Sequence, residues 1–170
     1  MSQVEYKEMI DDFENHYKYD CTYMRELLEY SPNGFARFSN FLPLSGHQEK
    51  LETEDYWVAK LAAVYVEDCG ECLQLNVRMA LEGGASKPII EAALKGGSTL
   101  PDALKDVYDY ARYVASNNII DPELIDRIEN RYDKGSLLEF GICIATAKVF
   151  PTIKRALGYT KSCSLIEIEV

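Results

Sequence analysis

The chain has 170 residues and a formal net charge of -10. This length suits one domain with a hydrophobic core, so we expect residues 1–170 to form a single domain. The acidic sequence contains no cluster of Lys and Arg. We therefore exclude nucleic acid as an expected partner, because phosphate contacts need clustered basic side chains.

No targeting or membrane segment is predicted. The first twenty residues lack a basic segment followed by an apolar run, so they do not form a secretory signal. The longest apolar stretch, residues 137–150, is interrupted by Glu139 and Lys148 and falls short of a membrane span of about 18 residues. We expect a soluble, cytoplasmic protein without a membrane partner.

Apolar residues spaced by three or four predict helices through the first part of the chain. The predicted helices cover residues 4–17, 23–30 and 53–66, with a short one around residues 35–41. The turn sequence beginning at Ser31-Pro32 ends the second of these, and residues 42–52 are interpreted as a connection. Thr53 is the expected N-cap of the helix at 53–66, which should be mostly buried.

The same spacing continues to residue 150 and makes the predicted class all-α, a bundle of about six to eight helices. Further helices are expected from the Cys-x-x-Cys motif to residue 81, over 87–95 and 101–117, from Pro122, and over 135–150. Pro151 should end or kink the last one. Residues 164–170 alternate apolar and acidic side chains, typical of either a frayed tail or a strand added to a partner.

Five cysteines are present, an odd number that argues against a framework of structural disulfides. They are Cys21, Cys69, Cys72, Cys143 and Cys163. Cys21 and Cys143 have apolar or aromatic neighbours and are expected to be buried in the core.

Cys69 and Cys72 form a Cys-x-x-Cys motif, which is found in redox pairs and in zinc sites. A zinc site needs about four ligands. The second half of such a site is missing, because the only histidines are His16 and His47, both in flanking or connecting segments. We expect no metal, which leaves a redox pair or two core cysteines.

The motif lies where one predicted helix ends and the next begins. Backbone N–H groups at a helix N-terminus stabilise a thiolate, the reactive form of cysteine. Glu67, Asp68 and Glu71 surround the thiols and should act in the opposite direction, because like charge disfavours a thiolate.

A helical projection of the segment after the motif separates two faces. Cys72, Leu75, Asn76 and Met79 share a mostly apolar arc, on which Asn76 lies one turn beyond Cys72. Asn76 must find a hydrogen-bond partner on this buried arc. Glu71, Gln74, Arg78 and Glu82 form a polar stripe that should face solvent.

The run from Leu61 through Cys69-Gly-Glu-Cys72 to Asn76, continued by Gly84-Ala-Ser86, resembles the core of the carboxymuconolactone decarboxylase / alkylhydroperoxidase-D-like superfamily. The resemblance covers residues 50–96 best. It implies an all-helical fold that assembles into homo-oligomers. It also implies that Cys72 is the thiolate that attacks a peroxide or disulfide, and that Cys69 is the resolving thiol.

Two positions depart from the superfamily pattern. Asn76 stands where the pattern has a histidine, and Trp57 stands where it has a glutamate. Asn76 cannot relay protons as imidazole does, and Trp57 has no acid–base function. Glu54 and Asp55 lie nearby in sequence, but they face other directions on the helix and are not expected to replace the missing glutamate.

The sequence suggests three candidate functions. The first is a thiol–disulfide oxidoreductase or peroxidase-like antioxidant protein that uses Cys69 and Cys72 without a cofactor, with activity weakened by the lost relay. Its partners would be a thiol reductant or a peroxide. The second is a non-catalytic helical oligomer that binds a small ligand or a protein. The third, decarboxylase-type chemistry, does not need the Cys-x-x-Cys motif and is disfavoured by its presence.

Overall fold

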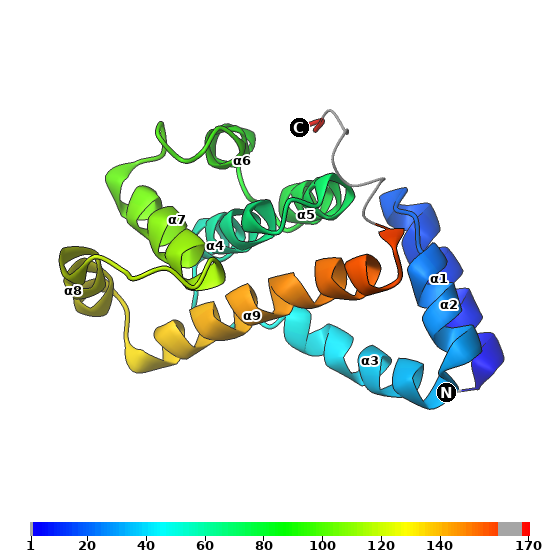
Figure 1. The fold of residues 1–170 in the computed structure, drawn as a ribbon. Coiled ribbons are helices and arrows are strands. Elements are labelled where there is room, and N and C mark those ends of the chain that lie inside the picture. The colour runs from blue at the N-terminus through cyan, green and yellow to red at the C-terminus, as the bar shows by residue number, and fades with distance from the viewer. Residues whose placement is uncertain (1, 160–167) are drawn as a thin grey trace.

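The computed structural model describes residues 2–159 and 168–170. Regular secondary structure in these residues is helical throughout, which confirms the all-α prediction (Figure 1). The nine helices of the described residues are α1 (Gln3–Tyr17), α2 (Thr22–Tyr30), α3 (Pro32–Ser45), α4 (Thr53–Val66), α5 (Gly70–Glu82), α6 (Lys87–Leu94), α7 (Asp102–Ala115), α8 (Pro122–Arg131) and α9 (Lys134–Ala156).

Helix α4 lies at the centre of the larger of two hydrophobic clusters. It ends at Val66 as predicted, but its N-cap is Glu52 and not Thr53, which is the first residue of the helix. Every residue from Tyr56 to Val64 is buried. Helices α5, α6, α7 and α9 all contact it (Figure 1). A helix that is apolar on nearly all sides can be stable only when it is surrounded in this way.

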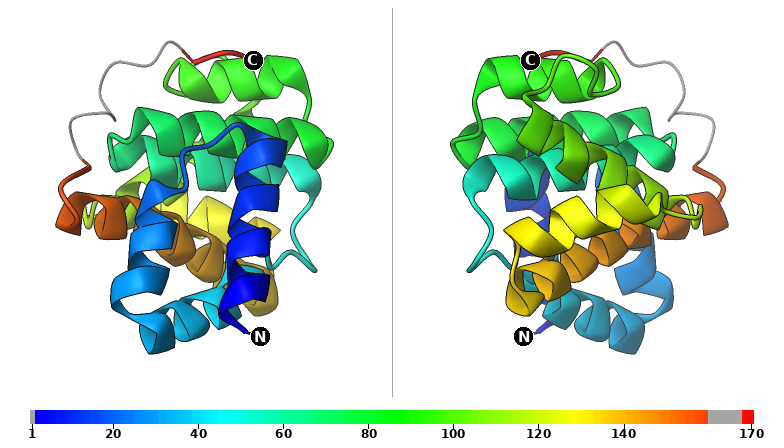
Figure 2. Two further views of the ribbon diagram at one scale, coloured as in Figure 1. Left: turned by 90° about the vertical axis from the view of Figure 1, so that its right-hand side faces the viewer. Right: turned by 90° about the vertical axis from the view of Figure 1, so that its left-hand side faces the viewer.

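The second cluster is formed by the N-terminal helices. Ile10, Cys21 and Phe35 are its most buried members. Helices α1 and α2 run side by side, at the side of the molecule opposite α8 (Figures 1 and 2). Helix α9 joins the two clusters, because its first half packs on α4 while Phe150 packs on the N-terminal helices.

Two prolines do not end helices where the sequence indicated. Helix α3 continues through Pro43 to Ser45, so the connection is shorter than residues 42–52. Helix α9 continues through Pro151 to Ala156. A proline inside a helix costs about 3 kcal/mol. Pro151 is buried, which helps to offset that cost.

By length and composition alone, α9 could cross a membrane, and it is the one such helix in the described residues. Its 18-residue apolar window is 44% buried within the protein. Phe140, Cys143 and Ile144 all belong to the core. A core helix of a globular domain has the same length and composition.

Glu139, on α9, holds the connection that precedes α4 in place. Its carboxylate is buried and accepts backbone N–H bonds from Glu49 (3.1 Å), Lys50 (2.9 Å) and Leu51 (3.1 Å). Burial by itself would raise the pKa of Glu139, but these three bonds outweigh burial and hold it below its usual value. This carboxylate therefore orders the segment that leads into the central helix.

The last residues of the chain lie against α5. Gln74 donates a bond to the Glu169 carbonyl (2.9 Å) and accepts one from the Glu169 N–H (2.7 Å). Ile168 and Val170 pack against the larger cluster. Residues 168–170 are thus docked rather than frayed. Residues 164–167 of the predicted strand-like stretch, and Cys163, lie outside the described residues.

Candidate functional site

Cys69 and Cys72 are joined by a disulfide at the start of α5. Cys69 is the N-cap residue and Cys72 is the third residue of the helix, with Cα atoms 5.3 Å apart. Both are nearly buried, with 4% and 3% of their surface exposed. The backbone N–H groups of this first turn lack carbonyl partners within the helix and favour negative charge on sulfur. The predicted location of the pair is confirmed.

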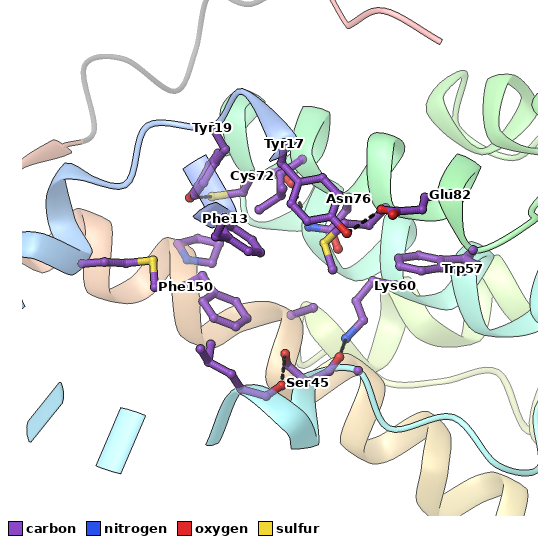
Figure 3. A pocket seen from close by; sticks show the side chains of 18 of the residues that line it. Phe13, Tyr17, Tyr19, Ser45, Trp57, Lys60, Cys72, Asn76, Glu82 and Phe150 are labelled. Carbon is purple, nitrogen blue, oxygen red and sulfur yellow. Dashed lines mark hydrogen bonds between the residues drawn. The ribbon is translucent and has the colours of Figure 1, made fainter. Parts of the chain in front are cut away.

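A pocket of about 490 Å³ lies beside the pair, where the two clusters meet (Figure 3). Cys72 lines this pocket, whereas Cys69 is not among the lining residues. Most of the wall is aromatic, aliphatic or thioether in character. Its members include Met9, Phe13, Tyr17, Tyr19, Tyr23, Met24, Leu42, Tyr56, Trp57, Leu75, Met79 and Phe150.

Tyr19 is the polar side chain that reaches the Cys72 sulfur. Its hydroxyl lies 3.8 Å from Cys72 Sγ, and either atom can donate (Figure 3). Against a thiolate only the hydroxyl can donate. Burial is the main reason that the pKa of Tyr19 is raised well above its usual value, so the hydroxyl keeps its proton near neutral pH.

A buried lysine stands next to Tyr19. Lys154 Nζ pairs with Glu71 Oε2 at 2.5 Å and lies 4.8 Å from the centre of the Tyr19 ring. The side chain is 3% exposed. Lys154 therefore neutralises a carboxylate that stands next to Cys72 in the sequence.

Two of the three carboxylates around the pair are neutralised by cations, which the sequence did not indicate. Glu67 forms ion pairs with Arg155 and with Lys148, the latter at 3.6 Å. Glu71 pairs with Lys154. Asp68 remains on the exposed surface. The expectation that three carboxylates disfavour a thiolate is wrong for two of them, because α9 supplies cations far along the chain.

The two positions that depart from the superfamily pattern both line the pocket. Asn76 donates to the Cys72 backbone carbonyl at 2.8 Å, which satisfies the predicted need for a partner. Trp57 packs perpendicular to Tyr56, with ring centres 5.1 Å apart. Neither side chain supplies an acid or a base to the pair.

Glu54 and Asp55 are engaged elsewhere. Glu54 accepts a hydrogen bond from Ser86 Oγ at 2.6 Å. Asp55 hydrogen-bonds with Tyr132, although burial is the larger influence and raises the pKa of its carboxyl group. Neither residue lines the pocket, in agreement with their expected directions.

The polar stripe on α5 faces solvent as predicted at Glu82, but its other members are partly or fully covered. Gln74 is buried under Glu169, and Arg78 donates to the backbone carbonyls of Tyr17 and Lys18. Glu82 accepts from Tyr17 at 2.6 Å. Polar side chains here fix α1 and the end of the chain to α5, a role that periodicity alone does not reveal.

Lys60 is a second buried lysine, and it was not among the predicted site residues. Its Nζ donates to the Ser45 carbonyl (2.8 Å), the Cys143 carbonyl (3.2 Å) and Thr146 Oγ1 (3.1 Å). None of the ion pairs among residues 2–159 and 168–170 involves Lys60. Burial lowers the pKa of Lys60 from its usual value.

The other two described cysteines are core residues, as predicted. Cys21 and Cys143 are reduced and essentially buried. Burial raises the pKa of the Cys21 thiol to about 12 and that of Cys143 to about 11. Within the described ranges no group of three or more His, Cys, Asp or Glu side chains could hold a metal ion.

No protein-family model, no characterised protein and no solved structure matches this chain. The alkylhydroperoxidase-D-like resemblance therefore stays a prediction from the residues around Cys69 and Cys72.

Proposed function

We propose that the chain is a thiol–disulfide oxidoreductase with peroxidase-like activity, in which Cys72 reacts and Cys69 resolves. The observation that carries this proposal is the position of Cys72, one partner of a disulfide, on the wall of a 490 Å³ pocket. Cys69 lies behind it at the N-cap of α5, as a resolving residue should. The proposal places the protein in the superfamily that the sequence resembles.

The reaction starts from the reduced pair. The Cys72 thiolate attacks a peroxide oxygen, the O–O bond breaks, the alcohol leaves after taking up a proton, and Cys72 becomes a sulfenic acid. The Cys69 thiol then attacks this sulfur, which releases water and forms the disulfide. A dithiol reductant restores both thiols by exchange through a mixed disulfide.

The environment of the pair supports this chemistry despite the missing relay. The start of α5 and the Tyr19 hydroxyl both favour a thiolate at Cys72. Lys154 offsets the charge of Glu71. The largely apolar wall fits an organic peroxide or disulfide better than hydrogen peroxide.

The decisive experiment is a count of free thiols in glutathione buffers of graded potential. We expect a reversible two-electron transition in the wild-type protein that is absent in Cys72→Ser, because Cys69 and Cys72 form the disulfide seen among the described residues. Cys143→Ser is the matched control, since it removes a buried core thiol and should leave the transition unchanged. A wild-type protein whose pair stays reduced and unreactive across the range would refute the proposal.

A second candidate is the non-catalytic binding module, which the size and apolar lining of the pocket favour. Cytoplasmic location and assembly into homo-oligomers also remain proposals, on the basis of the sequence alone.

A further inference from the structure

Lys60 poses a physical problem. A charged ammonium group inside a protein is costly unless an anion accompanies it. Lys60 is 4% exposed, and its three acceptors are two backbone carbonyls and a hydroxyl, all neutral. Within residues 2–159 and 168–170, no carboxylate lies within ion-pair distance of its nitrogen.

The fold does not need Lys60 to satisfy these acceptors. The Ser45 carbonyl also accepts from the Tyr56 hydroxyl at 2.9 Å. Thr146 Oγ1 makes its own bonds to the carbonyls of Ile142 (2.8 Å) and Cys143 (3.1 Å). Each acceptor of Lys60 therefore keeps another partner if the amino group is removed. Lys60 Nζ also lies 5.3 Å from the centre of the Tyr56 ring, a contact that favours a cation without supplying an anion.

Position in the pocket suggests what the amino group is for. Lys60, Tyr56 and Ser45 all line the pocket, and Figure 3 shows Lys60 extending toward Ser45 and away from Glu82. Two donors, Lys60 Nζ and the Tyr56 hydroxyl, converge on the Ser45 carbonyl at this end. A single charged donor beside a polar one is a suitable arrangement for one anionic group.

The charges on the wall are separated. With the disulfide formed, only Lys60 and Glu82 among the lining residues carry side chains that are ionised near neutral pH in water. Glu82 is 52% exposed and hydrogen-bonded to Tyr17 and His16, which places it at the solvent side of the pocket. The buried end is thus positive, and the surface between the two ends is largely apolar.

We propose that the pocket binds an amphipathic carboxylic acid, with its apolar chain along the aromatic and methionine wall and its carboxylate on Lys60 and Tyr56. The carboxylate replaces the Ser45 carbonyl as the acceptor for both donors, because a charged acceptor binds them more strongly. Ser45 precedes the exposed Gly46, so its carbonyl can turn to water. This binding does not depend on the proposed redox reaction, because no step involves sulfur.

The experiment is calorimetric titration of the full chain with decanoate, and with decanol as a neutral ligand of the same length. Wild type should bind decanoate about tenfold to a hundredfold more tightly than decanol, as expected for a charge-assisted hydrogen bond. Lys60→Met should remove that preference while retaining the weak binding of decanol. Lys105→Met is the matched control, because it removes a lysine paired with Asp109 on α7, away from the pocket.

Two results would overturn the inference. One is equal affinity of wild type for decanoate and decanol. The other is unchanged decanoate affinity in folded Lys60→Met. The thiol count in glutathione buffers tests the redox proposal by itself, because it involves no decanoate. The decanoate titration involves no thiol chemistry, so a failure of the ligand proposal is distinguished from a failure of the redox proposal.

Discussion

Tyr19 reaches Cys72 across 53 residues of sequence, and its hydroxyl is the polar group that lies 3.8 Å from the sulfur. Histidine can both accept and donate a proton near neutral pH, whereas a buried tyrosine can only donate a hydrogen bond there. Tyr19 therefore stabilises a thiolate without relaying protons. A slow enzyme with a stable thiolate is the expected result.

Tyr19→Phe should raise the pKa of Cys72 by about one unit, because it removes one hydrogen bond to a charged sulfur. The rate of thiol alkylation as a function of pH, measured in the Cys69→Ser background, gives this pKa. Tyr110→Phe, which removes a half-buried hydroxyl on α7, should leave it unchanged. An unaltered Cys72 pKa in Tyr19→Phe would show that the 3.8 Å contact does not act on the thiolate.

The effect of Lys60 on the free energy of unfolding should depend on pH. Burial lowers its pKa in the folded protein, so the unfolded chain binds more protons between that value and the usual 10.5. The cost of burying the charge is fully present below the folded pKa and is lost progressively as pH rises from that value toward 10.5. Lys60→Met should therefore be more stable than wild type, by about 1 kcal/mol or more near neutral pH.

That gain in stability should shrink as pH rises. Urea unfolding at about pH 6 and about pH 9 measures it directly, and Lys105→Met should show no comparable pH dependence. A gain that is constant or growing with pH would mean that Lys60 is not held in an unfavourable charged state.

At the level of elements, the connection before α4 depends on a single carboxylate. Glu139→Gln replaces an acceptor of three N–H bonds by an amide whose nitrogen would face N–H donors. We expect a loss of about 2 kcal/mol in the free energy of unfolding. Glu129→Gln, an exposed change on α8, is the control and should cost little.

The free energy of unfolding at acid pH tests the role of Glu139. Because its pKa is lowered in the fold, its contribution is present above the usual value of 4.5 and is lost as pH falls through the folded value. Wild type should lose stability over this range more steeply than Glu139→Gln. Parallel curves for the two proteins would contradict the assignment.

Local signals in the sequence were enough to predict most elements. The apolar run after Thr53 predicts α4, although the N-cap is Glu52, one residue before the predicted one. Pro43 and Pro151 lie inside helices, although local rules disfavour proline there. The resulting errors are confined to the ends of α3 and α9.

The site was predicted only in part. The Cys-x-x-Cys motif and its arc on α5 are visible in the sequence. Tyr19 and Lys154 are not, because they reach α5 from segments 53 and 83 residues away. Lys60 did leave a signal, as the one charged residue within the fully buried stretch from Tyr56 to Val64.

For the molecule as a whole, the pocket is a consequence of having two hydrophobic clusters rather than one. Phe13 and Met24 come from the N-terminal cluster, while Trp57 and Cys72 come from the larger one. Helix α9 contributes Phe150 and Pro151 and is shared by both. Any motion of the α1–α2 pair relative to α4 would change the shape of the pocket.

The only tryptophan of the chain is Trp57, and it lines this pocket. Its indole is 9% exposed and packs against Tyr56, one of the two proposed ligands of the carboxylate. Tryptophan emission from the unlabelled protein consequently originates at one known point on the pocket wall. Changes in its wavelength or intensity can follow the filling of the pocket in real time, with no competing chromophore of the same kind.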